Sequence, residues 1–387
     1  MKSIRKSVFL LIATTLFLPS FQSFFNIFEF YPLKGTFTIV PRPEFSLKTW
    51  MNGDYQEQAR QNINDHTGFR SVFVRFFNQV DYSLFSIAHA NRVVVGKNGY
   101  LYEERYINGV LGRDFIGNAV IDKRAKQIKE LQDRLWDQKH ILLLVLFPPD
   151  KGTFYEEYIP DRYLTKPKQL SNYLRNKEKL EENHVNFIDF NAWFLKIKDT
   201  SRYVLYPKTG IHWSSYGAFL AADSLAGYLE GKLKQRFAHP LCDSIHLSRH
   251  PLDRDADLEE IMNLKFKIPS PEMAYPFVHY DKQAGSAKPS ALFVGDSFYF
   301  IWANAGYIDN MFINNEFWYY NHDVFNGTVN TGKKVAQLNI LNEISRQNIL
   351  VIMQANAGYG IVGYNLVDGL LKALDSPANV ANSTFVR

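Results

Sequence analysis

Apolar residues along this chain follow two alternating patterns. Over about residues 122–139 and 168–183, charged residues are interleaved with apolar ones at helical spacing, which predicts two amphipathic helices. Continuous apolar runs predict strands that are buried on both faces, namely ILLLVLF, NFIDF, SALFVGDSF and NILVIMQANAGYG. Such alternation predicts an α/β fold with a mainly parallel sheet, whose ligands bind at the carboxyl ends of the strands.

The stretch before this alternation has a different pattern. From residue 52 to about residue 88, apolar residues recur at helical spacing, with a break near Thr67-Gly68, so two short helices are expected. The following segment RVVVGKNGYLYEE places two apolar runs on either side of Asn98-Gly99. An Asn-Gly pair between apolar runs is a strong signal for a β-hairpin.

The N-terminus has the pattern of an export signal. Lys2, Arg5 and Lys6 precede the apolar run VFLLIATTLFL, and FQSFFNIFEF continues the apolar character after Pro19. The first run alone is shorter than the roughly 20 residues that cross a bilayer, and no clear A-x-A cleavage site follows it. We interpret residues 1–30 as a signal anchor or signal peptide, and favour an uncleaved anchor with its basic end in the cytoplasm. A buried core helix is the alternative, and the basic residues and an expected break at Pro19 argue against it.

Composition excludes several classes of protein. The 387 residues are 46% hydrophobic and 21% charged, as in a folded globular protein. The net charge of +5 is spread without a long basic block, so a nucleic-acid partner is not expected. The single cysteine, Cys242, excludes an internal disulfide and a cysteine-based zinc site. Since no His/Asp/Glu cluster has metal-ligand spacing, we expect neither a metal nor a cofactor.

Ser297 lies where the predicted strand ALFV ends and the turn Gly295-Asp296-Ser297 begins. A nucleophile would be exposed at such a position. The alternative is that Asp296 or Ser297 caps the N-terminus of a helix, since both are common capping residues.

His212 is the histidine best placed to activate a serine. It lies in a Gly-bearing loop next to Trp213, just before Ser214 and Ser215, which are candidate caps for the helix SYGAFLAADSLAGYL. A serine hydroxyl is a poor nucleophile until an adjacent base takes its proton. A packed or capping histidine is the alternative.

A third candidate stretch, FPPDKGTFYEEYIP, follows the predicted strand that ends at Phe147. Its two prolines would fix a rigid exit that presents Asp150, Lys151 and Tyr155; a purely structural loop is the alternative. The stretch YDKQAG has the composition of a solvated turn.

These stretches together resemble a known family. Similar blocks occur in the same order in the SGNH-hydrolase-like proteins related to AlgJ and AlgX, which are bacterial polysaccharide O-acetylation proteins. In this chain the blocks are GKNGYLYEE, FPPDKGTFYEEYIP, KTGIHWSSYGAFLAA, DADLEEIMNL, LFVGDSF and FWYYN. The resemblance implies a flavodoxin-like three-layer SGNH domain over 91–387, after a helical lead-in over 31–90.

By this resemblance Ser297 is the nucleophile and His212 is the base. The family block is usually Asp-x-His-Trp, but this chain has Gly210 in place of the aspartate, so no side chain at that position orients the imidazole. Either the site is impaired or another group holds Nδ1–H, namely a backbone carbonyl or a carboxylate from another loop, such as Asp150 or Asp323.

The resemblance implies O-acetyl transfer to an exported polysaccharide through an acetyl-serine. The oxyanion would be held by the backbone N–H of Ser297 and by Asn356. Because acetyl-CoA is not expected outside the cytoplasm, a membrane-bound O-acyltransferase would be the partner that supplies acetyl groups, and the protein would be periplasmic. The rings expected to hold the sugar, with core packing as their alternative role, are those of Trp213, Tyr155, Trp318, Tyr319 and Tyr320.

Two other functions are compatible with the sequence. An acetylesterase would use the same Ser297 and His212 with water as acceptor. A polysaccharide-binding or assembly protein with an inactive site would be consistent with Gly210.

Overall fold

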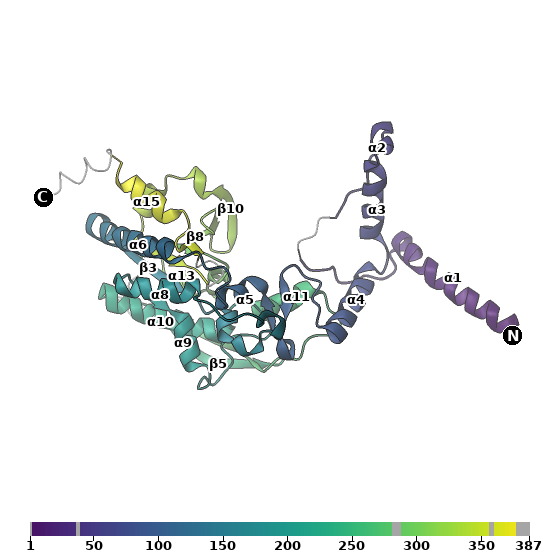
Figure 1. The fold of residues 1–387 in the computed structure, drawn as a ribbon, viewed down its shortest axis with the longest axis horizontal. Coiled ribbons are helices and arrows are strands. Elements are labelled where there is room, and N and C mark those ends of the chain that lie inside the picture. The colour runs from purple at the N-terminus through teal and green to yellow at the C-terminus, as the bar shows by residue number, and fades with distance from the viewer. Residues whose placement is uncertain (1, 36–38, 281–287, 356–359, 377–387) are drawn as a thin grey trace. The chain divides into compact units, whose positions relative to one another are not determined.

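A computed structural model describes residues 2–35, 39–280, 288–355 and 360–376 (Figure 1). The chain divides into two compact units. Unit 1 consists of Met1–Val95 and Leu258–Ile268, and unit 2 of Gly96–Asp257 and Pro269–Arg387. Each unit is described by itself.

Unit 1 begins with the apolar helix α1 (Lys2–Phe25). The 22 residues Ile4–Phe25 have a mean hydropathy of 1.8 and are long and apolar enough to cross a membrane. The expected break at Pro19 is wrong, because α1 continues through it to Phe25. A proline removes one backbone N–H donor, which weakens or kinks a helix without by itself ending it.

The remaining helices of unit 1 are α2 (Leu47–Met51), α3 (Asp54–His66) and α4 (Arg70–Phe85). The predicted break at Thr67-Gly68 is confirmed. A Cβ on Gly68 would lie 2.4 Å from the carbonyl oxygen of Pro19, so only glycine allows this close approach to α1.

The segment 258–268 belongs to unit 1, although it lies within the range 91–387 expected for the SGNH-like domain. Two side chains of α4 bind its backbone. Asn78 Nδ2 donates to the carbonyl of Met262 at 2.7 Å, and Gln79 Oε1 accepts from the N–H of Phe266 at 2.9 Å. A segment far along the chain is thereby held on α4.

The turn predicted at Asn98-Gly99 is confirmed. β1 (Val93–Val95) precedes it and β2 (Leu101–Glu103) follows it, with the short 3-10 helix η1 (Lys97–Gly99) between them. The N–H of Gly96 donates to the carbonyl of Tyr100 at 2.7 Å, and Asn98 has a φ of +56°, which asparagine tolerates better than most residues.

Unit 2 contains a seven-stranded sheet, and the predicted α/β fold with a mainly parallel sheet is confirmed. The strand order is β10-β9-β8-β7-β11-β3-β4. The four neighbouring pairs β8-β7, β7-β11, β11-β3 and β3-β4 are parallel. β9 is antiparallel to both of its neighbours, β8 and β10. The strands are β3 (Leu142–Phe147), β4 (Phe187–Asp189), β7 (Ala291–Gly295), β8 (Glu316–Tyr319), β9 (Asp323–Asn326), β10 (Val329–Lys334) and β11 (Ile349–Met353).

Helices pack on both faces of this sheet because the central strands are apolar on both faces. α6 (Asn118–Lys139), α8 (Asn172–Glu182) and α15 (Leu366–Leu374) share one buried cluster with alternate residues of β3, β7 and β11. On the opposite face lies α12 (Tyr299–Asn304), where the ring of Tyr299 stacks on Phe317 at 4.0 Å. The other elements of unit 2 are α5 (Glu104–Val110), α7 (Lys151–Phe154), α9 (Phe190–Ile197), α10 (Ser215–Leu233), β5 (Pro240–Ser248), β6 (Met273–Tyr280), α13 (Tyr307–Met311) and α14 (Ile340–Ile344), and α11 (Asp257–Met262) begins in unit 2 and ends in unit 1.

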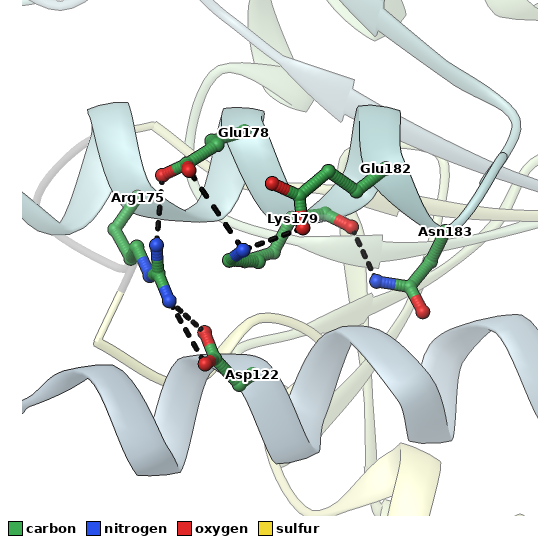
Figure 2. Close-up of polar contacts among 6 residues, drawn as sticks. All are labelled: Asp122, Arg175, Glu178, Lys179, Glu182 and Asn183. Carbon is green, nitrogen blue, oxygen red and sulfur yellow. Dashed lines mark hydrogen bonds and ion pairs between the residues drawn. The ribbon is translucent and has the colours of Figure 1, made fainter.

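A charged pair joins α8 to α6, and further charged pairs lie along α8 (Figure 2). The guanidinium of Arg175 donates to both carboxylate oxygens of Asp122, at 2.7 and 2.8 Å, and to Glu178 at 2.9 Å. Lys179 pairs with Glu182 one turn further along α8. Of these contacts only that of Arg175 with Asp122 joins the two helices, and the others lie within α8.

The central strand β11 supplies a test of the fold. Leu350 is 0% exposed, and truncating a fully buried leucine removes apolar contacts and leaves a cavity. We expect Leu350→Ala to lower the free energy of unfolding, measured by chemical denaturation, by about 2–5 kcal/mol. The control Val329→Ala removes a 67% exposed side chain from the edge strand β10, and should change that free energy by less than about 0.5 kcal/mol. If both substitutions lowered the free energy of unfolding equally, the burial of Leu350 in the core would be contradicted.

Candidate active site

The turn Gly295-Asp296-Ser297 joins the end of β7 to α12. A Cβ on Gly295 would lie 2.1 Å from the carbonyl oxygen of Met353 on β11, so glycine is required where the two strands end together. Asp296 then ties the strand ends, because its carboxylate accepts from the N–H of Ala355 at 2.6 Å and from the N–H of Phe298 at 3.1 Å. Burial raises the pKa of Asp296, and these two N–H donors oppose that shift.

Ser297 is partly exposed on this turn, at the carboxyl ends of the parallel strands. The alternative in which Ser297 caps the following helix is wrong, because the residue at the cap position of α12 is Phe298, whose N–H is bound by the carboxylate of Asp296. The hydroxyl of Ser297 is instead directed at a histidine.

His212 and Ser297 lie side by side although 85 positions separate them. The Oγ–H of Ser297 donates to His212 Nε2 at 2.8 Å. The imidazole is 4% exposed and packs edge-on against the ring of Phe298, at 4.9 Å between ring centroids. Capping of α10 is done by Ser214, whose Oγ accepts from the N–H of Gly217 at 2.9 Å, so His212 is not the capping residue.

Asp257 is the carboxylate that orients the imidazole. Its Oδ2 accepts from His212 Nδ1 at 2.7 Å, and its Oδ1 accepts from the N–H of Ile211 at 2.9 Å. A carboxylate only accepts hydrogen bonds, so the proton lies on Nδ1 and the lone pair of Nε2 faces Ser297. The three side chains have the geometry of a Ser-His-Asp triad.

The expectation that Asp150 or Asp323 orients His212 is therefore wrong. Asp150 caps α7, and its Oδ1 accepts from the N–H of Thr153 at 2.8 Å. Asp323 lies on β9, where it accepts from His322 Nδ1 at 3.0 Å. Asp323 also pairs with Lys334 on β10, so both carboxylates have partners other than His212.

Gly210 explains why the carboxylate comes from another loop. A Cβ at this position would lie 2.8 Å from the carbonyl oxygens of both Arg254 and Asp255, so the loop that carries Asp257 occupies the space of a side chain. Thr209 Oγ1 also donates to the carbonyl of Asp255, at 3.2 Å. The absence of a side chain at position 210 is what allows this second segment to approach.

Sequence reasoning missed Asp257, although the block DADLEEIMNL contains it. That block offers Asp255 and Asp257 two residues apart, and no pattern in the sequence distinguishes them. Their difference is spatial, because Asp255 is 3% exposed and does not bind the imidazole, whereas Asp257 faces it.

Three of the rings expected to hold a sugar are buried, and that prediction is wrong for them. Trp213 and Trp318 are both 0% exposed; Trp213 packs against Trp302 at 4.8 Å between ring centroids, and Trp318 Nε1 donates to Glu316 at 2.7 Å. The hydroxyl of Tyr155 donates to a backbone carbonyl at 2.9 Å within the interior. Their size and apolar character place them in the core.

Tyr319 and Tyr320 lie next to the Gly-Asp-Ser turn. The N–H of Tyr320 donates to the carbonyl of Gly295 at 2.7 Å, and Tyr320 is 36% exposed. The ring centroids of Tyr319 and Tyr320 are 4.4 Å apart. Tyr320 also has a φ of +51°, an unfavourable value for a bulky residue, and such strain is often found at functional sites.

Asn356, the second expected oxyanion donor, lies outside the described residues. Among the residues that the structure describes, no group of three or more His, Cys, Asp or Glu side chains is placed to hold a metal ion.

One family model matches the chain. Residues 93–298 match the family model described as "SGNH hydrolase-like domain, acetyltransferase AlgX", and this range contains Ser297, His212 and Asp257. No curated protein matches the chain.

Solved structures with a similar fold include three bacterial proteins. The O-acetyltransferase domain of Pseudomonas putida AlgJ is 15% identical with a TM-score of 0.46, and the match covers 76% of this chain and 99% of that one. Pseudomonas aeruginosa AlgX is 15% identical with a TM-score of 0.45, covering 72% and 67%. Bacillus cereus PatB1 is 13% identical with a TM-score of 0.39, covering 63% and 91%. On the family match, which extends over more than half of its residues, the chain belongs to the SGNH hydrolase-like family of the acetyltransferase AlgX.

Proposed function

We propose that this protein transfers acetyl groups to an exported polysaccharide through an acetyl-serine intermediate. The observation that carries the proposal is the hydrogen-bonded series Asp257–His212–Ser297 in a chain of an acetyltransferase family. Gly210 no longer argues for an inactive site, because a carboxylate occupies the orienting position from another loop.

The first displacement forms the acetyl-serine. His212 Nε2 takes the proton of Ser297 as Oγ attacks the carbonyl carbon of the acetyl donor. The imidazolium then gives this proton to the leaving oxygen of the donor, and the bond from that oxygen to the acetyl carbon breaks. Asp257 remains ionised and stabilises the imidazolium.

The second displacement passes the acetyl group to the sugar. His212 Nε2 accepts the proton of a sugar hydroxyl, whose oxygen attacks the acetyl-serine carbonyl. The ester bond to Oγ breaks, and the proton returns from the imidazolium to Ser297. In both steps the backbone N–H of Ser297 would donate to the oxyanion, with Asn356 as the proposed second donor.

Transfer requires that a sugar reach the acetyl-serine before water does. Tyr319 and Tyr320 are the proposed sugar-binding rings, because Tyr320 is exposed and hydrogen-bonded through its backbone to the turn of the nucleophile. Aromatic faces bind the apolar faces of sugar rings while the hydroxyls remain hydrated.

The proposed location is the periplasm, with α1 as an anchor in the inner membrane. α1 is apolar enough to cross a membrane, and Arg5 and Lys6 lie at its N-terminal end. A membrane-bound O-acyltransferase is the proposed partner that supplies acetyl groups. Anchoring in the same membrane would keep this protein close to that partner.

Replacing the nucleophile tests the reaction. We expect Ser297→Ala to abolish acetylation of the polysaccharide in cells, because no hydroxyl remains to carry the acetyl group. The control Ser345→Ala changes an exposed serine after α14 and should leave acetylation unchanged. Unchanged acetylation in Ser297→Ala would identify an assembly protein instead. Product analysis of the wild type with an oligosaccharide acceptor separates transfer from hydrolysis, since free acetate alone would identify an esterase.

Replacing the orienting carboxylate tests the triad. Asp257→Asn keeps the shape of the side chain but favours the wrong imidazole tautomer, so we expect kcat to fall by about 10³–10⁴-fold with little change in KM. The measurement is hydrolysis of 4-nitrophenyl acetate by the purified protein. Asp323→Asn is the matched control and should retain wild-type kcat. A large loss in the control, or none in Asp257→Asn, would remove Asp257 from the mechanism.

A further inference from the structure

Lys151 is a fully buried lysine that the proposed reaction does not use. It is the first residue of α7, it is 0% exposed, and its ammonium lies among three backbone carbonyls. Nζ donates to the carbonyl of Pro207 at 2.7 Å, to that of Lys208 at 2.8 Å, and to that of Gly210.

The number of acceptors favours the charged form of this side chain. An ammonium has three N–H donors and no acceptor, and each donor here has one carbonyl. A neutral amine would have two donors, and its lone pair would face the third carbonyl oxygen. Burial of a charge is costly unless all its hydrogen bonds are made, and this site makes all three.

The three carbonyls belong to the loop that leads directly to His212. Gly210 is two residues before the imidazole, and the next carbonyl along the chain, that of Ile211, accepts from the buried hydroxyl of Tyr206. The N–H of Ile211 is bound by Asp257. Lys151 and Tyr206 thus bind the loop through its carbonyls, while Asp257 binds it through an N–H.

Charged and titratable groups surround Lys151 on several sides. Burial lowers its pKa well below the usual range, and Lys208 lowers it further, whereas Asp257 and Asp255 raise it. Burial also raises the pKa of Asp255 to about 7. The rings of Tyr102 and Tyr206 lie 6.0 and 5.7 Å from Nζ, and burial raises the pKa of both hydroxyls, so they remain neutral when the lysine titrates.

We propose that the ammonium of Lys151 is a positioning group that gathers the carbonyls of Pro207, Lys208 and Gly210 and thereby holds His212 between Asp257 and Ser297. It touches no reacting atom. The inference rests on the proposed function, since it concerns the base that activates Ser297.

The test measures how fast Ser297 reacts with a fluorophosphonate, which bonds to Oγ with loss of fluoride. Lys151→Met keeps the length of the side chain and removes its charge and donors. We expect the labelling rate to fall by about 100-fold, because a shift of about 1 Å in a catalytic group costs a factor of that order. Lys166→Met is the control: it makes the same change at an exposed lysine outside this loop, and should stay within about twofold of wild type.

The pH profile of labelling distinguishes positioning from general support of the fold. In the wild type the rate should fall at alkaline pH, below the value of about 10.4 for an exposed lysine, as Lys151 loses its proton and releases one carbonyl. Circular dichroism should show an intact fold over this range. Lys151→Met should lack the descending part of the profile, and if this variant does not fold, the wild-type profile alone decides.

The outcomes separate the two proposals. If His212→Ala is labelled at Ser297 as fast as the wild type, the dyad is not functional and both proposals are overturned. If the wild type depends on His212 but Lys151→Met reacts at the wild-type rate, the role of Lys151 alone is overturned. A wild-type rate that does not decline up to the pH of an exposed lysine also overturns it.

Discussion

The carboxylate of Asp257 is the contact on which the site depends. One oxygen holds the imidazole of His212 and the other holds the N–H of Ile211, so the same group fixes both the ring and the backbone that carries it. Two hydrogen bonds to one carboxylate restrict rotation of the imidazole about its own side-chain bonds. The charge also selects the tautomer whose free nitrogen faces Ser297.

The sheet determines where the serine lies. β7 and β11 are parallel and end together, and Gly295 lets their backbones approach more closely than any other residue would. Asp296 then joins the two strand ends through the N–H of Ala355, and Ser297 follows on a turn that cannot move independently of the core. Ser297 is therefore as rigid as the strands, whereas His212 lies on a loop that needs its own internal contacts.

Much of the fold could be predicted from the sequence because burial on both faces leaves continuous apolar runs, and β3, β7 and β11 have them. Ser297 and His212 could be singled out because each lies next to the boundary of an element. Asp257 could not, since its role depends on a loop packing against Gly210. The exposure of Trp213 and Trp318 could not be predicted either, because a large ring suits a core and a sugar platform equally well, and only packing decides between them.

The glycine at position 210 has a consequence for how relatives of this protein are judged. A search pattern that requires an acidic residue two places before the histidine would classify this chain as having lost its chemistry. In the structure an acidic residue does bind the histidine, namely Asp257, which lies 45 positions after His212. The lack of a side chain at Gly210 leaves the room that this segment needs. An apparent defect in one linear motif can therefore coincide with an intact arrangement in space, when another part of the chain supplies the missing acid.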